Sequence, residues 1–233
     1  MFYYMDPTYI LVLIGAIICM IASANVKSTY QRFAQIRSMT GMTGAQVAER
    51  LLRSAGIHDV KVGHVPGELS DHYDPTKKVV NLSDSVYGSA SVASIGVAAH
   101  ECGHAIQHAK GYAPLKFRTW FVPVANFGSK LAWPLILIGL FINAESSQFI
   151  INAGIFLFSF AVIFQLVTLP VEFNASSRAL VLLEQQGILS EQELPYTKKV
   201  LKAAAYTYVA SAASAILQLL RIIILVGGRR RDD

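Results

Sequence analysis

Long runs of apolar residues dominate the chain and predict helices that lie in a membrane. Residues 9–26 form a run of 18 residues without a charged side chain, and residues 149–169 form a second, more strongly apolar run. At about 1.5 Å per residue, such runs can cross a hydrocarbon core of roughly 30 Å with help from flanking residues. Tyr3, Tyr4 and Tyr9 suit the interfacial zone beside the first run. The pattern thus predicts an N-terminal span and a later, stronger one.

Two further apolar regions follow less regular patterns. Residues 131–143 are short for a span, but the region extends upstream past Lys130, whose long stem can reach the interface. The connection 144–148 is brief and has no positive charge, so we expect a helical hairpin around it. Residues 203–226 begin with small side chains that favour helix–helix packing, and Arg221 then interrupts them. This last region is either a fourth span or a helix packed against the rest of the chain.

The residues between the first two spans follow a different pattern, with short amphipathic segments. Thr43 and Gln46 have the spacing of a capping box in front of a helical run, and Gly56 ends that run. Alternation of apolar and polar positions then predicts two short strands. The expected elements are a helix at 45–55, strands at 60–65 and 78–82, a turn at 74–77 and a helix from Ser89 onward. We therefore expect a mainly α membrane protein with one small α+β unit and three or four transmembrane helices.

The composition agrees with this interpretation. The chain of 233 residues is 53% hydrophobic, which is too apolar for an ordinary soluble domain. No basic region precedes the first apolar run, so we expect an uncleaved anchor. The two cysteines offer no disulfide framework, which fits a reducing compartment. The expected segments are an N-terminal anchor (1–26), an α+β segment (27–118), a transmembrane hairpin (119–171), a helix with a connector (172–202), and a C-terminal apolar helix with a basic tail (203–233).

The charge pattern concerns the membrane rather than a nucleic acid. The formal net charge is +5, but no dense run of Lys and Arg is interleaved with aromatic residues, so nucleic-acid binding is not expected. Basic residues instead flank the apolar runs, for example in 27–37 and 178–202. The positive-inside rule then places the long segment 27–118 and the segment after residue 172 in the cytoplasm. The arginines at 229–231 agree with this placement only if the last apolar region does not cross fully.

Residues 100–104 read HECGH and match the zinc-binding pattern H-E-x-x-H. On a helix, His100 and His104 lie one turn apart on the same face, so both imidazoles can bind one Zn²⁺ ion. Glu101, beside the first ligand, can hold a water molecule without binding the metal and take its proton as general base. The pattern also arises by chance, so a helix with incidental histidines is the alternative. Small residues such as Gly103 favour the metal site, because they allow close packing.

Two residues compete for the position of third ligand. His108 lies eight residues after His100, roughly 12 Å along a continuous helix, whereas ligand nitrogens stand only about 3–4 Å apart. The glycine that breaks the helix when a third histidine binds is missing, because Gln107 occupies its position. Glu172 is the better candidate, since it follows the second strong span at the same predicted membrane face. The alternative is that Glu172 is only a charge favoured at a helix start.

Other polar residues are candidates for supporting roles. Asn174 and Ser176 could hold a ligand by hydrogen bonds. His72 and Tyr73 lie in the loop before the second predicted strand, where they either border the cleft and donate to an oxyanion or stabilise a turn. We expect His108 to be structural or close to the substrate.

At this point the sequence resembles the YugP-like membrane zinc metallopeptidases of bacteria. The segments that carry the resemblance are 42–52, 64–87, 96–118 and 169–189, which follow the family's order along the chain. The family is more distantly similar to HtpX-type membrane peptidases, whose third ligand is a glutamate beyond a pair of membrane helices. The resemblance implies a zincin-like unit with one Zn²⁺ on His100, His104 and Glu172, and with Glu101 as base. It also implies that residues 78–82 form an edge strand that pairs with extended substrate.

Together these features predict a membrane-anchored zinc endopeptidase of the bacterial cell membrane, with its site on the cytoplasmic side. Peptides or membrane-protein segments near the bilayer are the expected substrates, and the oligomeric state is left open. One alternative is a catalytically silent zinc-binding scaffold, although a scaffold needs only ligands and Glu101 is intact. Another is an intramembrane protease, which needs the motif inside a lipid-spanning helix; the polar character of residues 89–108 argues against it.

Overall fold

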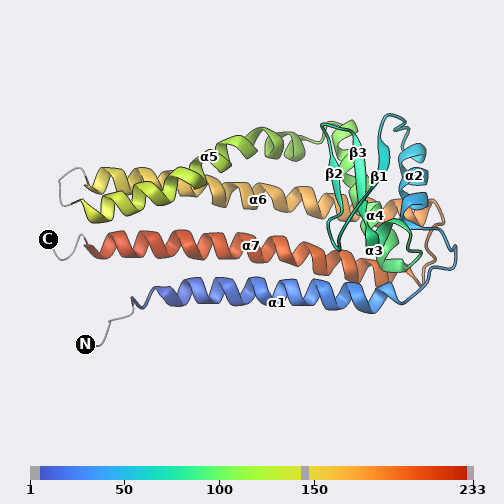
Figure 1. The fold of residues 1–233 in the computed structure, drawn as a ribbon, viewed down its shortest axis with the longest axis horizontal. Coiled ribbons are helices and arrows are strands. Elements are labelled where there is room, and N and C mark those ends of the chain that lie inside the picture. The colour runs from blue at the N-terminus through green and yellow to red at the C-terminus, as the bar shows by residue number, and fades with distance from the viewer. Residues whose placement is uncertain (1–5, 143–146, 230–233) are drawn as a thin grey trace. The chain divides into compact units, whose positions relative to one another are not determined.

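The computed structural model describes residues 6–142 and 147–229 (Figure 1). The elements are α1 Tyr9–Ala34, α2 Gly44–Ser54, β1 Lys61–Val65, β2 His72–Asp74, β3 Val79–Ser83, α3 Asp84–Tyr87, α4 Val92–Ala109, α5 Ala113–Phe141, α6 Ser147–Gln185 and α7 Leu194–Arg229. They confirm the expected fold class, mainly helical with one small sheet.

The chain forms two compact units. The apolar unit holds the chain up to Ala22, residues 117–169 and the chain from Thr207 onward. The α/β unit holds residues 23–116 and 170–206. The boundaries of the five expected segments stay a prediction.

Within the described residues, four helices of the chain are long and apolar enough to cross a membrane, namely α1, α5, α6 and α7. The last apolar region thus supplies a fourth candidate span. Small residues on both helices let α7 pack closely on α1: a Cβ atom at Gly15 of α1 would lie only 2.8 Å from the Oγ atom of Ser214 in α7. Arg221 does not interrupt α7; its guanidinium pairs with Asp6 at 3.5 Å and lies 4.0 Å from the ring centroid of Tyr9.

Three expectations concern residues outside the described part of the chain. They are the interfacial role of Tyr3 and Tyr4, most of the connection at 144–148, which has no positive charge, and the placement of Arg230 and Arg231.

The sheet of the α/β unit has the order β1-β3-β2, with β1 parallel and β2 antiparallel to β3 (Figure 1). The expectation that residues 78–82 form an edge strand is therefore wrong. β3 is the central strand, since Val79 pairs with Lys61 on one side and with Asp74 on the other. The second neighbour, β2, has only three residues, too few to show an alternating pattern.

Local signals in the α/β unit place several elements where the sequence predicts them. Thr43 and Gln46 form both hydrogen bonds of the capping box at the start of α2. The carboxylate of Asp74 accepts hydrogen bonds from the backbone N–H groups of Thr76 and Lys77, which makes the predicted turn between β2 and β3. Gly56, which follows α2, has a φ of +73°, a conformation that glycine adopts without a steric penalty.

The core of the α/β unit surrounds α4, the helix that carries the H-E-x-x-H motif. One face of α4 packs on α2 and buries Ala98, Ala99 and Cys102 completely. Burial raises the pKa of the Cys102 thiol, which therefore behaves as an uncharged packing group. The intramembrane-protease alternative requires the motif helix to cross the membrane, but α4 is not among the candidate spans.

α6 includes both the strong apolar run at 149–169 and the helix expected at the start of segment 172–202. It runs through Pro170 without a break and is one helix of 39 residues. A proline inside a helix removes one hydrogen bond and costs about 3 kcal/mol, which strong helical signals on both sides can offset. Glu172 therefore lies well inside α6, and the alternative that it is a charge at a helix start is wrong.

Candidate metal centre

The helix α4 brings His100 and His104 together by its own geometry. The helix is continuous over both residues, and the i, i+4 spacing places the rings on one face with centroids 4.7 Å apart. Their Nε2 atoms are 3.2 Å apart, and both side chains are largely buried. The Nε2 atoms of both imidazoles thus converge beside the helix.

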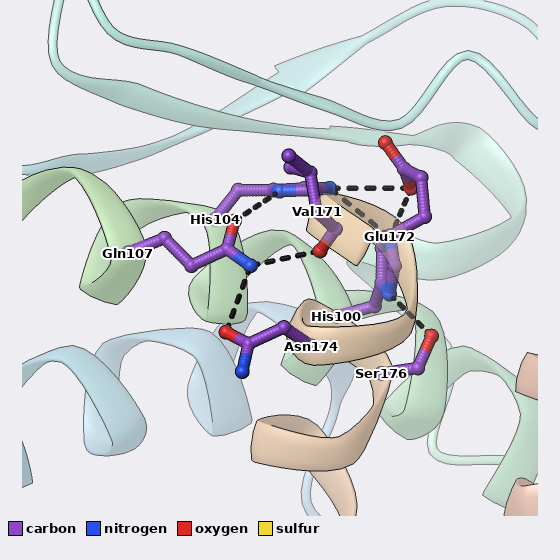
Figure 2. Close-up of polar contacts among 7 residues, drawn as sticks. All are labelled: His100, His104, Gln107, Val171, Glu172, Asn174 and Ser176. Carbon is purple, nitrogen blue, oxygen red and sulfur yellow. Dashed lines mark hydrogen bonds and ion pairs between the residues drawn. The ribbon is translucent and has the colours of Figure 1, made fainter. Parts of the chain in front are cut away.

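Glu172 reaches the same point from α6, as Figure 2 shows. Its Oε2 atom lies 3.2 Å from Nε2 of His100 and 3.5 Å from Nε2 of His104. The residue is only 2% exposed, so that the carboxylate is held within the protein rather than in solvent. Glu172 lies 72 positions after His100 in the sequence, yet its oxygen joins the two histidine nitrogens in a single cluster.

The donor set and its spacing fit a zinc ion. In a tetrahedral site with bonds of about 2.0–2.1 Å, two ligand atoms stand roughly 3.3–3.4 Å apart, close to the three distances between these atoms. Two imidazoles and one glutamate are also the donors of a catalytic zinc site with a fourth position left for water. Burial lowers the pKa of His104, but hydrogen bonding to Glu172 and the charges of Glu101 and Glu172 outweigh burial and raise it. The cluster thus favours positive charge.

The outer nitrogens of both imidazoles have partners. Nδ1 of His100 lies 3.1 Å from Oγ of Ser176, and Nδ1 of His104 lies 3.0 Å from Oε1 of Gln107 (Figure 2). Ser176 is thus placed where a supporting role was expected. Asn174 does not follow that expectation directly, since its Oδ1 atom accepts a hydrogen bond from Gln107 rather than contacting a ligand.

Gln107 was missed as a site residue. In the sequence it figured only as the residue that replaces a helix-breaking glycine. A polar residue three positions after the second histidine, in the apolar stretch AIQ, was the available signal, because a buried amide needs partners.

Glu101 follows the first histidine on α4 and is 8% exposed. It lies next to His100 in sequence on the same helix, and its charge helps to raise the pKa values of His104 and Cys102. Its carboxylate is not among the three ligand atoms that converge.

The other candidate residues lie outside the cluster. Nδ1 of His108 is 2.8 Å from the Tyr73 hydroxyl, and His108 is exposed one turn beyond His104. Burial, together with the charges of Asp59 and Asp74, raises the pKa of Tyr73, which keeps its hydroxyl protonated as a possible donor. His72 and Tyr73 lie in β2, so the expectation that they belong to a loop is wrong. The His72 ring bonds the Ser70 carbonyl and the side chain of Asn81, its partner on β3. Roles of these residues toward substrate stay predictions.

A glycine sets the distance between the two helices that carry the cluster. A Cβ atom at Gly103 of α4 would lie 2.7 Å from the backbone oxygen of Ala175 in α6 and 3.1 Å from its Cα atom. Such contacts are with backbone, which cannot rotate away as a flexible side chain can. The absence of a side chain at Gly103 therefore lets α6 approach α4 closely enough for Glu172 to join the histidines.

We expect Gly103→Ala to lower stability and to weaken metal binding, although alanine favours helices. Overpacking a tight contact costs about 1–3 kcal/mol, and it displaces α6 from α4. Thermal unfolding and zinc titration of the detergent-solubilised protein measure both effects. Gly88→Ala is the matched control, because a Cβ atom there meets nothing within 4 Å. Equal zinc affinity and equal stability in the two variants would contradict this account of the helix contact.

A helical membrane protein whose buried cluster of two histidines and one glutamate begins with H-E-x-x-H falls in the class of membrane zinc metallopeptidases. The chain belongs to the family described as "Putative neutral zinc metallopeptidase", whose model matches residues 8–227. It is 46% identical over 209 residues to the "Putative membrane protease YugP" of Bacillus subtilis (strain 168), covering 89% of this chain and 92% of that protein. No solved structure matches the chain. The resemblance inferred from the sequence is confirmed.

Proposed function

We propose that the protein is a membrane-anchored, zinc-dependent endopeptidase. The observation that carries the proposal is the convergence of His100, His104 and Glu172, whose ligating atoms lie within 4.8 Å of one another. Membership of a zinc metallopeptidase family supports the identity of the metal. One ion is proposed, because the three atoms converge on a single point.

The roles of the side chains follow from their positions. When bound, zinc supplies a Lewis acid that acidifies water and polarises a peptide carbonyl. His100, His104 and Glu172 would hold it, and Glu101 is the general base. Glu101 takes a proton from the attacking water as the water oxygen bonds to the carbonyl carbon. It then gives that proton to the amide nitrogen as the C–N bond breaks, which yields a carboxylic acid and an amine.

The location of the site suggests the substrates. Glu172 lies on α6, which is also a candidate span, so the cluster is carried by a helix that can enter the membrane. We propose that substrates are peptides or membrane-protein segments close to the bilayer. The basic residues in 27–37 and 178–202 support a cytoplasmic site, and the Bacillus subtilis relative supports a bacterial cell membrane.

Removing zinc is expected to abolish peptide hydrolysis reversibly. The full chain is purified in detergent, treated with a chelator, and assayed on an unstructured protein and a peptide library by mass spectrometry. Cleavage should disappear on chelation and return when about one equivalent of Zn²⁺ is added. Cleavage that persists without metal would contradict the proposal. Stoichiometric zinc binding without cleavage of any peptide would favour the scaffold alternative instead.

A further inference from the structure

The side chain of Gln107 bridges the two helices that carry the cluster, as Figure 2 shows. It is completely buried. Its Oε1 atom lies 3.0 Å from Nδ1 of His104, and its Nε2 atom donates to the backbone oxygen of Val171 at 2.8 Å and to Oδ1 of Asn174 at 3.0 Å. A single amide thus contacts one of the proposed ligands on α4 and the backbone next to another, Glu172, on α6.

These contacts determine which way the amide points. The Val171 carbonyl can only accept a hydrogen bond, so the NH₂ group of Gln107 must face it and the oxygen must face His104. Because that oxygen can only accept, Nδ1 of His104 must carry a proton. A neutral His104 then has its lone pair on Nε2, the atom that points at the cluster. Gln107 thereby selects the tautomer that can bind a metal.

Asn174, which accepts a hydrogen bond from the Gln107 amide, is itself held in place. Oδ1 of Asn174 accepts hydrogen bonds from Gln107 and from Nε of Arg178, at 3.0 and 2.7 Å. The guanidinium of Arg178 also lies over the ring of Tyr112, 5.9 Å from its centroid. Asn174 is therefore held as an acceptor, which leaves the Gln107 amide little freedom to flip.

The outer nitrogen of His100 has a different kind of partner. It contacts the hydroxyl of Ser176, which can either donate or accept a hydrogen bond. Ser176 therefore does not impose a tautomer on His100, whereas Gln107 imposes one on His104. Of the two residues that contact an outer imidazole nitrogen, Gln107 is the one that dictates where the proton lies.

We propose that Gln107 is a positioning residue that fixes the tautomer and ring orientation of His104 and ties it to the α6 backbone beside Glu172. This rests on the proposed function only in that the cluster binds zinc. Partners that orient a ligand in this way typically contribute about 10–100-fold to metal affinity. Gln107→Met, which keeps the length of the side chain but removes its polar atoms, should weaken zinc binding by that factor.

The test compares zinc affinity, by competition with a chromophoric chelator, across variants of the full chain in detergent. Thr197→Val is the matched control, because Thr197 is equally buried and donates to the Val92 carbonyl of α4 but does not contact the cluster. It should bind zinc like the wild type even if it unfolds at a lower temperature. Asn174→Asp keeps the acceptor for Gln107 and should stay within about threefold of wild type, whereas Asn174→Leu should fall toward Gln107→Met.

The visible spectrum of the Co²⁺-substituted protein is a second readout, sensitive to ligand geometry. Gln107→Met should change its bands and Thr197→Val should not. Wild-type zinc affinity and an unchanged cobalt spectrum in folded Gln107→Met would overturn the inference while leaving the proposed function intact. A wild-type chain that binds no zinc would instead contradict the proposed function, and with it the basis of this inference.

Discussion

Glu101→Gln is expected to lower kcat for peptide hydrolysis by about 10²–10⁴-fold, the usual contribution of a general acid–base. Glutamine has nearly the same shape as glutamate but cannot take a proton from water at neutral pH. Because Glu101 is not one of the three proposed zinc ligands, the variant should still bind zinc with nearly unchanged affinity. Steady-state cleavage of a fluorogenic peptide and zinc titration measure the two properties separately.

Glu49→Gln serves as the control for this experiment, since Glu49 is an exposed residue of α2 that pairs with Arg53. It should hydrolyse the peptide at the wild-type rate. If Glu101→Gln also retained the wild-type rate, the proposed mechanism would be wrong even if zinc were bound.

Glu172→Ala is expected to weaken zinc binding by more than the 10–100-fold typical of outer partners, because it removes one of three ligands. Peptide hydrolysis should be lost with the metal. Metal content after dialysis, measured by elemental mass spectrometry, gives the result directly, and thermal unfolding shows whether the variant is folded.

His108→Ala provides the opposing case, since His108 is exposed and contacts Tyr73 outside the cluster. It should keep its zinc. A Glu172→Ala protein that stays loaded while His108→Ala loses its metal would show that the histidine, and not the glutamate, completes the site.

The two histidines of the cluster could be predicted from the sequence, because their proximity follows from helix geometry over four residues. The spacing of His100 and His104 implies a shared helix face, and an unbroken helix argues against His108. Glu172 was harder, since its distance in the sequence gives no contact by itself. Its position after an apolar span and the family resemblance made it the better candidate, and the structure places it 3.2 Å from His100.

The errors concern features that depend on tertiary packing. The family resemblance implied that residues 78–82 form an edge strand, and no sequence pattern predicts β2, which has only three residues and gains its hydrogen bonds from β3. The alternative that Glu172 is a charge at a helix start fails because α6 continues through Pro170, where the helical preference on both sides outweighs one lost hydrogen bond. The only local signal for Gln107 is its position three residues after His104, which does not by itself show that it is buried. Its role depends on Val171 and Asn174, which arrive from another helix.

The central claim is that one zinc ion is held by His100, His104 and Glu172. An experimental structure of the zinc-loaded protein, with anomalous scattering recorded at the zinc absorption edge, tests it most directly. We predict one strong peak about 2.0–2.2 Å from Nε2 of both histidines and from a carboxylate oxygen of Glu172. A peak bound by His108 in place of Glu172, or no peak between α4 and α6, would contradict the account.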